Sequence, residues 1–408
     1  MKVGGTATAH LTDVKIRGTS GQGTGVVMEG GTVTIMERVW IEGVKTGVYA
    51  TNGRLVMKGG KIEFTSGAGN GNYGVGVGVS GGVVTMMGTK IVGTSGGTGK
   101  GVYATGTGKL VMSGVWIEGV GKGVEVSGEG MLEMMGNSTI IFTGDYGVKV
   151  GSGVASAILT DVKIMGKDGG TGMYGVQMTG EGTMVMNMVD ILQVGVGVYA
   201  SNGRLKMNMG KIEFTSGAGN GNYGVGVGVS GGVVTMMGTT IMGSGSGKGT
   251  GVYISGGAVM LSGVNISKVE KGVSASNGKL VMKGGTKITF AGGTGSYGVK
   301  VGSGGNALFY GVSITGSGRE GTGVVMDGKM LMMDGVDISG VGMGVEVSEG
   351  NLVMHKGSIG FTGNYGIYLI RGNALLNDIT ITGPGDKSTG TGMYVGSSGK
   401  IVMKDVTM

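Results

Sequence analysis

Short runs in which hydrophobic and polar residues alternate recur along the whole chain, and glycine-rich turns separate them. One such stretch reads Val48-Tyr49-Ala50, then Leu55-Val56-Met57, then Lys61-Ile62-Glu63-Phe64. A period of two is typical of a β-strand with one buried face, and no helical period competes with it. The predicted inward residues are Val48, Ala50, Leu55, Met57, Ile62 and Phe64; the predicted outward residues are Tyr49, Arg54, Val56, Lys58, Lys61 and Glu63.

An internal repeat organises these runs. The segment that begins at Gly47 returns at Gly197 with only four substitutions, which are Thr51 to Ser201, Val56 to Lys206, Lys58 to Asn208 and Gly59 to Met209. Weaker copies begin at Gly123, Gly272 and Gly344. Each copy of roughly 75 residues divides into three coils of about 21 to 28 residues, so the chain contains about seventeen coils.

A single coil is too small to bury its own apolar face, so like positions must stack from coil to coil, about 4.8 Å apart. The sequence therefore predicts an all-β protein, a single-stranded parallel β-helix with three short strands per coil. Parallel crossovers favour the right-handed form. We expect residues 1–408 to form one domain that is open at both ends, a fragment of a longer protein, because neither end carries the polar cap that solenoids need.

Composition supports a packed solenoid and limits its chemistry. Glycine supplies 101 residues and proline one, while hydrophobic residues make up 39%, so the glycines are turn residues of a packed fold rather than a disordered linker. Cysteine is absent, which excludes disulfides and thiolate chemistry. With only His10 and His355 available, we expect no metal site and no cofactor. Methionines recur at one inward position and predict a stacked core ladder: Met57, Met112, Met207, Met282 and Met354.

The net charge of +7 comes mainly from lysines that are interleaved with acidic residues along the chain. Nucleic-acid binding usually shows as a basic stripe with arginine and stacking aromatics, and arginine is scarce here, so we expect no nucleic-acid partner. Charge alone predicts no more than weak binding to anionic glycans. No run of about eighteen apolar residues exists, so we expect no transmembrane helix.

The phrases GVYATNGRLVMKGGKIEF, GVVTMMGTKIVG and GVWIEGV make the chain resemble the passenger domains of bacterial autotransporters, and more narrowly those of Bartonella. The resemblance covers essentially the whole chain. It implies a signal peptide upstream, an outer-membrane translocator barrel downstream, and secretion from, or display on, the bacterial surface. For an angiogenic member of that family it implies binding to a vascular endothelial growth factor receptor and a mitogenic signal. It supplies no residue-level site.

Candidate contact residues lie at outward positions where the residue type differs from that in the neighbouring coils. Both tryptophans, Trp40 and Trp116, fall at the outward position of a third strand, with Glu63 and Lys90 expected between them. Three coils separate them, or about 14 Å. Exposed tryptophan flanked by charge is typical of an interface hot spot. The alternatives are that a neighbouring loop covers each ring or that the register is inverted there.

A second outward set consists of tyrosines in the first strand of the coil. Such side chains stack on sugars or anchor a protein partner, although the high strand propensity of tyrosine gives a simpler alternative in which they only decorate the surface. Tyr49 and Tyr103 are the members nearest the tryptophans; the others are Tyr199, Tyr253, Tyr368 and Tyr394.

An enzymatic alternative rests on Asp190 and Glu213, which the pattern places in one column of successive coils, near the carboxylate separation of a retaining glycosidase. Lys163 stacks beside them, and no second acidic cluster or long loop builds a cleft. His10 and His355 are too far apart in coil order to join a Ser-His-Asp triad. We therefore predict a non-enzymatic virulence factor or adhesin that binds a host-cell surface protein. A display rod without a specific receptor, and a polysaccharide-acting enzyme, are the alternatives.

Overall fold

The computed structural model describes residues 1–30, 33–65, 74–94, 97–167, 173–216, 224–245, 247–318, 320–385 and 390–408. The regular elements in these ranges are all β-strands. The chain divides into two compact units, Met1–Lys206 and Met207–Met408. Both are built as a right-handed parallel β-helix, and together they make about 15 turns, close to the expected seventeen coils. The predicted fold class is thereby confirmed, while the single domain over residues 1–408 stays a prediction.

Each coil of the first unit (Met1–Lys206) contains three strand positions. The first-position strands are β1 (Lys2–Val3), β4 (Thr24–Met28), β7 (Thr46–Ala50), β10 (Val75–Val79), β13 (Lys100–Ala104), β20 (Tyr174–Met178) and β23 (Val196–Ala200). The second-position strands are β2 (Thr8–Thr12), β5 (Val33–Glu37), β8 (Arg54–Lys58), β11 (Val83–Met87), β14 (Lys109–Ser113), β16 (Met131–Met135), β18 (Ser156–Thr160) and β21 (Thr183–Asn187). The third-position strands are β3 (Lys15–Arg17), β6 (Trp40–Val44), β9 (Lys61–Thr65), β12 (Lys90–Thr94), β19 (Val162–Gly166) and β22 (Asp190–Val194), and β15 (Trp116–Val126) and β17 (Ser138–Val150) each run from a third into a first position.

The second unit (Met207–Met408) repeats this plan with longer continuous strands. β24 (Arg204–Asn208) contains the division between the units. The strands that occupy one position are β25 (Lys211–Ser216), β26 (Val225–Val229), β27 (Val233–Met237), β28 (Thr240–Gly245), β29 (Thr250–Ile254), β30 (Ala258–Ser262), β31 (Asn265–Val269), β33 (Lys287–Phe290), β35 (Ser313–Gly316) and β36 (Thr322–Met326). The strands that run through several positions are β32 (Lys271–Lys283), β34 (Tyr297–Tyr310), β37 (Met330–Val347), β38 (Asn351–Thr382) and β39 (Thr391–Thr407).

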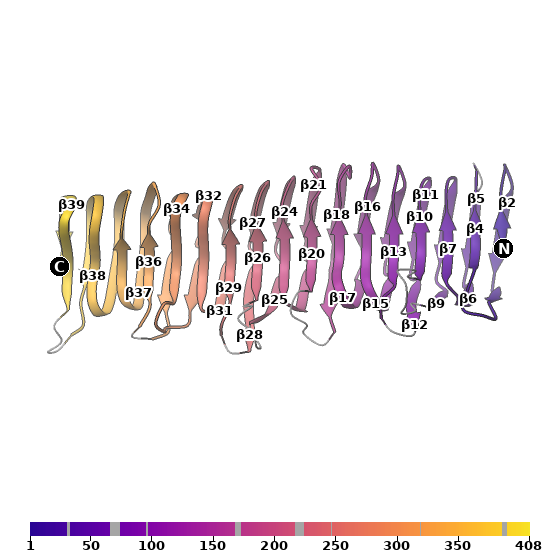
Figure 1. The fold of residues 1–408 in the computed structure, drawn as a ribbon, viewed down its shortest axis with the longest axis horizontal. Helices are drawn as coiled ribbons and strands as arrows, with labels where there is room; N and C mark the ends of the chain where they lie inside the picture. The colour runs from indigo at the N-terminus through magenta and orange to yellow at the C-terminus, as the bar shows by residue number, and fades with distance from the viewer. Residues whose placement is uncertain are drawn as a thin grey trace. The chain divides into compact units, whose positions relative to one another are not determined.

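Neighbouring coils pair in parallel and in register, so residues of the same kind lie beside one another. In the first unit β7 pairs with β4 on one side and with β10 on the other, as the adjacent arrows of Figure 1 show. Val48 is thus aligned with Val26 and Val77. The repeat in the sequence therefore becomes a set of columns in space, and each outward column can be considered as a surface of its own.

The predicted alternation is confirmed residue by residue in the coil that contains β7, β8 and β9. The six residues expected inside are all at most 1% exposed, whereas Tyr49 is 39% exposed. The methionine ladder is also confirmed, because its five members are at most 1% exposed. These methionines fill the core as hydrophobic side chains.

A pairing of glycine with isoleucine recurs in the core of successive coils. The second residue of β13 is Gly101, and a Cβ atom added there would lie 2.5 Å from Ile117 Cγ2 and 2.7 Å from the carbonyl oxygen of Gly123 in the next coil. The same two obstacles, an isoleucine Cγ2 and a glycine carbonyl oxygen, recur at Gly47 and Gly298. The glycine is therefore required by close packing within the coil and between coils.

We expect Gly298→Ala to destabilise the second unit by about 1–3 kcal/mol, because the new methyl group has no space beside Ile314 and the Gly323 carbonyl. The matched control is Gly293→Ala, where an added Cβ meets nothing within 4 Å. Urea denaturation of the two variants beside the parent protein measures the difference. Equal stability of both variants would contradict this account of the glycine column.

Candidate functional site

Both tryptophans lie in one register column of the first unit. Lys15 in β3 is aligned with Trp40 in β6, and Trp40 with Lys61 in β9. Lys61 is aligned with Lys90 in β12, and Lys90 with Trp116 in β15. We call these five residues the tryptophan face. The predicted alignment of Trp40, Lys90 and Trp116 is confirmed.

The prediction that Glu63 lies between Trp40 and Lys90 in this column is wrong. Lys61 occupies that place, and Glu63 lies two residues further along β9, opposite Val92. Lys61 and Glu63 both point outward, so alternation alone does not distinguish them. The register is fixed instead by the inward side chains, since Ile62 is aligned with Ile41 and Ile91. A bulge after Ile41 then shifts the remainder of the strand.

The indole rings are presented to solvent and held in place by lysines. Trp40 is 42% exposed and Trp116 is 41% exposed, which contradicts both the covering loop and the inverted register. The Nζ atoms of Lys15 and Lys61 lie 4.6 Å and 5.4 Å from the centre of the Trp40 ring. Lys90 Nζ lies 5.9 Å from the centre of the Trp116 ring. These cation–π contacts restrict the rings without covering them.

Three carboxylates beside the tryptophan face neutralise its lysines. Lys15 Nζ lies 3.1 Å from Glu42 Oε1, Lys61 Nζ lies 2.6 Å from Glu63 Oε2, and Lys90 Nζ lies 2.9 Å from Glu118 Oε1. Trp116 Nε1 also donates a hydrogen bond of 2.8 Å to Glu118. The hydrogen bond from Lys90 lowers the pKa of Glu118. This face therefore combines fixed aromatic rings with nearly balanced charge, which suits it to protein contact better than to acid catalysis.

The predicted tyrosines do not join this face. Tyr49 and Tyr103 belong to first-position strands, whereas the tryptophan face belongs to third-position strands. Both tyrosines are aligned with Gly78, and the ring of Tyr49 lies against that glycine. Lys100 Nζ lies 3.7 Å from the centre of the Tyr103 ring. The six candidate residues thus form two separate surfaces. Among the remaining tyrosines, Tyr199 contacts Tyr174 with ring centres 5.8 Å apart and Tyr253 is 42% exposed.

Sequence reasoning missed a polar network on the first-strand face of the first unit. Lys100 Nζ lies 2.7 Å from Glu125 Oε2, and the Tyr146 hydroxyl donates a hydrogen bond of 2.6 Å to the same carboxylate. Burial favours a higher pKa for Glu125, but the hydrogen bonds from Lys100 and Tyr146 outweigh it and lower the pKa. Glu125 is therefore a satisfied, ionised carboxylate.

Glu125 belongs to the sequence motif Gly-Val-Glu-Val-Ser at residues 123–127 of the first unit, and the same motif recurs in the second unit at residues 344–348. Its carboxylate is Glu346, and here the balance is reversed. Burial, followed by the charge of Asp327, raises the pKa of Glu346 against the opposing effect of Lys300. Repetition of the motif in the sequence could have identified the two glutamates as equivalent. Their partners could not be predicted, because they come from other coils and depend on register.

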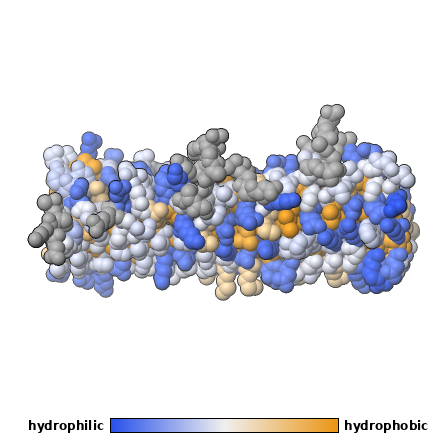
Figure 2. Space-filling model, turned by 90° about the horizontal axis from the view of Figure 1, so that it is seen from below, coloured by the Kyte–Doolittle hydropathy of each residue, from blue (hydrophilic) through white to orange (hydrophobic). Residues whose placement is uncertain are grey.

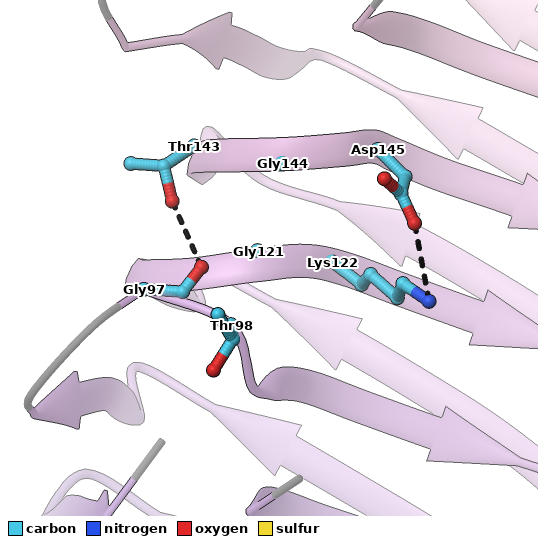
Figure 3. A pocket seen from close by; sticks show the side chains of 7 residues that line it. All are labelled: Gly97, Thr98, Gly121, Lys122, Thr143, Gly144 and Asp145. Atoms are coloured by element: carbon cyan, nitrogen blue, oxygen red, sulfur yellow. Dashed lines mark hydrogen bonds and ion pairs between the residues drawn. The ribbon is translucent and has the colours of Figure 1, made fainter. Parts of the chain in front are cut away.

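A hollow of about 350 Å³ lies at a corner of the first unit, between three successive coils (Figure 3). Gly97, Gly121 and Gly144 line it with backbone, together with the side chains of Thr98, Lys122, Thr143 and Asp145. Lys122 Nζ lies 3.1 Å from Asp145 Oδ2. Thr143 Oγ1 donates a hydrogen bond of 2.9 Å to the Gly97 carbonyl oxygen. Among the described residues that line it, Asp145 is the one carboxylate, so these residues alone do not form the carboxylate pair that glycoside hydrolysis uses.

A smaller hollow of about 240 Å³ lies on the second-strand face of the second unit, among Leu280, Val281, Ala307, Leu308 and Met330, with Lys279 and Asn306 at its edge. It belongs to an outward apolar column whose half-buried members are aligned from coil to coil: Met260, Val281, Leu308, Met332 and Val353. Hydrophobic and hydrophilic residues are likewise interspersed on the face seen in Figure 2. Outward positions of this fold are thus not uniformly polar.

The column proposed for a carboxylate pair is not formed as expected. Asp190 is aligned with Lys163, as predicted. In the second unit, however, Thr240 is aligned with Lys211, and Glu213 is aligned with Met242. Glu213 Oε2 lies 2.7 Å from Lys211 Nζ. The error has the same origin as that at Glu63, since each strand offers two outward positions.

Two further structural observations apply to the described ranges only. No group of three or more histidine, cysteine, aspartate or glutamate side chains gathers there in a way that could hold a metal ion. No helix in the same ranges has the length and apolar character needed to cross a membrane.

Comparison with known families agrees with the fold. The model of a family described as a right handed beta helix region matches residues 250–407, which lie in the second unit. No curated protein matches the chain. The family match concerns architecture, and β-helices with and without enzymatic activity share that architecture.

The opposite pKa shifts of Glu125 and Glu346 predict opposite effects of pH on stability. The pKa of Glu125 is lowered in the folded protein, so its ionised form stabilises the fold above the ordinary glutamate pKa and this contribution is lost as the pH falls. Glu125→Gln should therefore lower the free energy of unfolding by about 1–3 kcal/mol at pH 7, and by less as the pH falls below 4.

The pKa of Glu346 is raised, so its ionised form disfavours folding at a pH above the ordinary glutamate pKa. Glu346→Gln should raise stability at pH 7.

Denaturant unfolding of both variants and the parent at pH 7 and at pH 4 measures these effects. Each variant serves as the control for the other, because the local phrase is the same. A loss of stability at pH 7 in both variants would contradict the raised pKa of Glu346.

Proposed function

We propose that this chain is a non-enzymatic surface protein that binds a host-cell surface protein through the tryptophan face. The observation that carries the proposal is the presence of Trp40 and Trp116 in one register column, 42% and 41% exposed and each in contact with lysine. Tryptophan is the residue most enriched at the energetic centre of protein interfaces. No other tryptophan occurs in the sequence.

The geometry of this face reduces the cost of binding. Long exposed side chains usually lose rotamer freedom when a partner orders them. Here Lys15 and Lys61 flank Trp40, and Glu118 accepts a hydrogen bond from Trp116. The rings are therefore held before the partner arrives. Because Glu42, Glu63 and Glu118 pair with the lysines, contact depends on shape and aromatic area more than on net charge.

The remaining parts of the proposal rest on the resemblance and on the fold. A right-handed β-helix is consistent with an autotransporter passenger or an adhesin-like rod. We accordingly propose secretion from, or display on, the bacterial surface, and a vascular endothelial growth factor receptor as the first partner to be tested. The paired state of the carboxylates at Glu42, Glu63 and Glu118 favours binding over catalysis. Weak binding to anionic glycans stays a prediction.

The double substitution Trp40→Ala with Trp116→Ala should weaken binding to the purified receptor ectodomain at least about tenfold, since hot-spot residues each contribute about 2 kcal/mol or more. Surface plasmon resonance with the full chain measures this change. The matched control is Met131→Ala with Ile158→Ala, which removes two side chains that are 43% and 37% exposed on the second-strand face of the same unit.

If the parent binds and the tryptophan variant binds equally well, the tryptophan face is not the contact surface. If the parent binds neither the ectodomain nor endothelial cells, the display rod becomes the better description. Circular dichroism and thermal unfolding establish that both double variants retain the parent fold.

A further inference from the structure

The motif Gly-Val-Glu-Val-Ser occupies the same strand position in both units, but the residues aligned with its glutamate differ. In the first unit Glu125 is aligned with Tyr103 in the preceding coil and with Lys149 in the following coil. In the second unit Glu346 is aligned with Val325 and with Tyr368. Because the two glutamates occupy equivalent register positions, the first unit shows which kind of group can pair with a glutamate at this position.

In the first unit the chain supplies its own ammonium group. Lys100 lies three residues before Tyr103 on β13 and is aligned with Lys122. Its Nζ atom lies 3.7 Å from the centre of the Tyr103 ring and 2.7 Å from Glu125. One cation thus rests on an aromatic face and pairs with the half-buried carboxylate at the same time.

In the second unit the corresponding cations are absent from the sequence. Thr322 takes the place of Lys100, since it is aligned with Met343 as Lys100 is with Lys122. Met343 and Tyr368 take the places of Lys122 and Lys149. Lys300, whose charge reaches Glu346, pairs with Asp327 at 3.0 Å. Within the part of the chain that the structure describes, no hydrogen bond or ion pair reaches Glu346.

An aromatic cluster lies next to Glu346. The rings of Tyr368 and Tyr394 are stacked with centres 5.0 Å apart, and Tyr365 lies 4.7 Å from Tyr368 and 5.7 Å from Tyr394. Tyr394 is 44% exposed. Tyrosine faces carry negative electrostatic potential, so the cluster and the carboxylate attract the same kind of ligand.

We propose that Glu346 and the cluster of Tyr365, Tyr368 and Tyr394 form a binding site for a lysine or arginine side chain of a partner protein. The incoming cation takes the role that Lys100 has in the first unit, resting on a tyrosine ring and pairing with the carboxylate. Charge complementarity identifies the occupant. Burial and the charge of Asp327 disfavour the ionised form of Glu346, and a bound cation would favour that form again. This site lies in the second unit and does not depend on the tryptophan face.

The test uses the full chain labelled with ¹³C-methyl methionine, in which Met343, aligned with Tyr365, is the reporter. Its signal is assigned with Met343→Leu. The probe is the peptide acetyl-Gly-Lys-Gly-amide, and the reference peptide carries acetyl-lysine in place of lysine. We expect a saturable shift of the Met343 methyl signal with the lysine peptide and at least a fivefold weaker response with the acetylated one.

Three variants define the site. Glu346→Gln keeps the shape, removes the charge and should weaken the apparent affinity at least fivefold. Thr322→Lys should abolish the response, because an internal ammonium would then occupy the site as Lys100 does. Glu125→Gln, at the equivalent position that already holds Lys100, should leave the response unchanged. Thermal unfolding establishes that each variant is folded.

The proposal is overturned if the Met343 signal does not respond to the lysine peptide. It is equally overturned if Glu346→Gln or Thr322→Lys responds as the parent does. A response that the acetylated peptide reproduces would assign the contact to the peptide backbone and also count against a cation site.

Discussion

The close approach of glycine to isoleucine is the constraint on which the rest of this fold depends. At Gly47, Gly101 and Gly298 there is no space for a Cβ atom between an isoleucine methyl group and the carbonyl oxygen of the next coil. Each coil can therefore stack on its neighbour only in one register, since a slip would bring a larger side chain to this place. The abundance of glycine, which composition alone assigns to turns, is in part a requirement of the core.

Fixed register converts sequence repetition into surface columns, and the columns determine which contacts are possible. Lysines and glutamates on adjacent columns of the first unit pair across coils, as Lys15 does with Glu42 and Lys90 with Glu118. Because such exposed pairs contribute little stability, they chiefly set the local charge and hold neighbouring aromatic rings. The tryptophan face arises in this way from residues that are distant in sequence but adjacent in register.

Alternation predicted the inward residues correctly, because period-two patterning is a property of a single strand. It could not assign Glu63 to the correct column, since Lys61 and Glu63 are both outward and the choice depends on the partner strand. The backbone conformation at the coil corners could not be predicted from the sequence either. Arg38, Met188 and Met209 have φ values of 51°, 51° and 59°, a region usually taken by glycine. The duplicate position to Met209 is Gly59, with φ of 62°, so the backbone is retained while the side chain changes.

The same separation of backbone from side chain explains how one repeat can carry different chemistry. Glu125 and Glu346 share a sequence motif and a place in the coil, yet Lys100 pairs with Glu125, whereas among the described residues no ammonium group pairs with Glu346 and Thr322 takes the place of Lys100. A substitution on an outward column changes the surface without disturbing the glycine and isoleucine that set the register. Selection for binding can therefore act on outward columns while the register of the coils is retained. For this reason, residues such as Trp40, which is aligned with lysines on both sides, identify functional surfaces better than residues that follow the repeat.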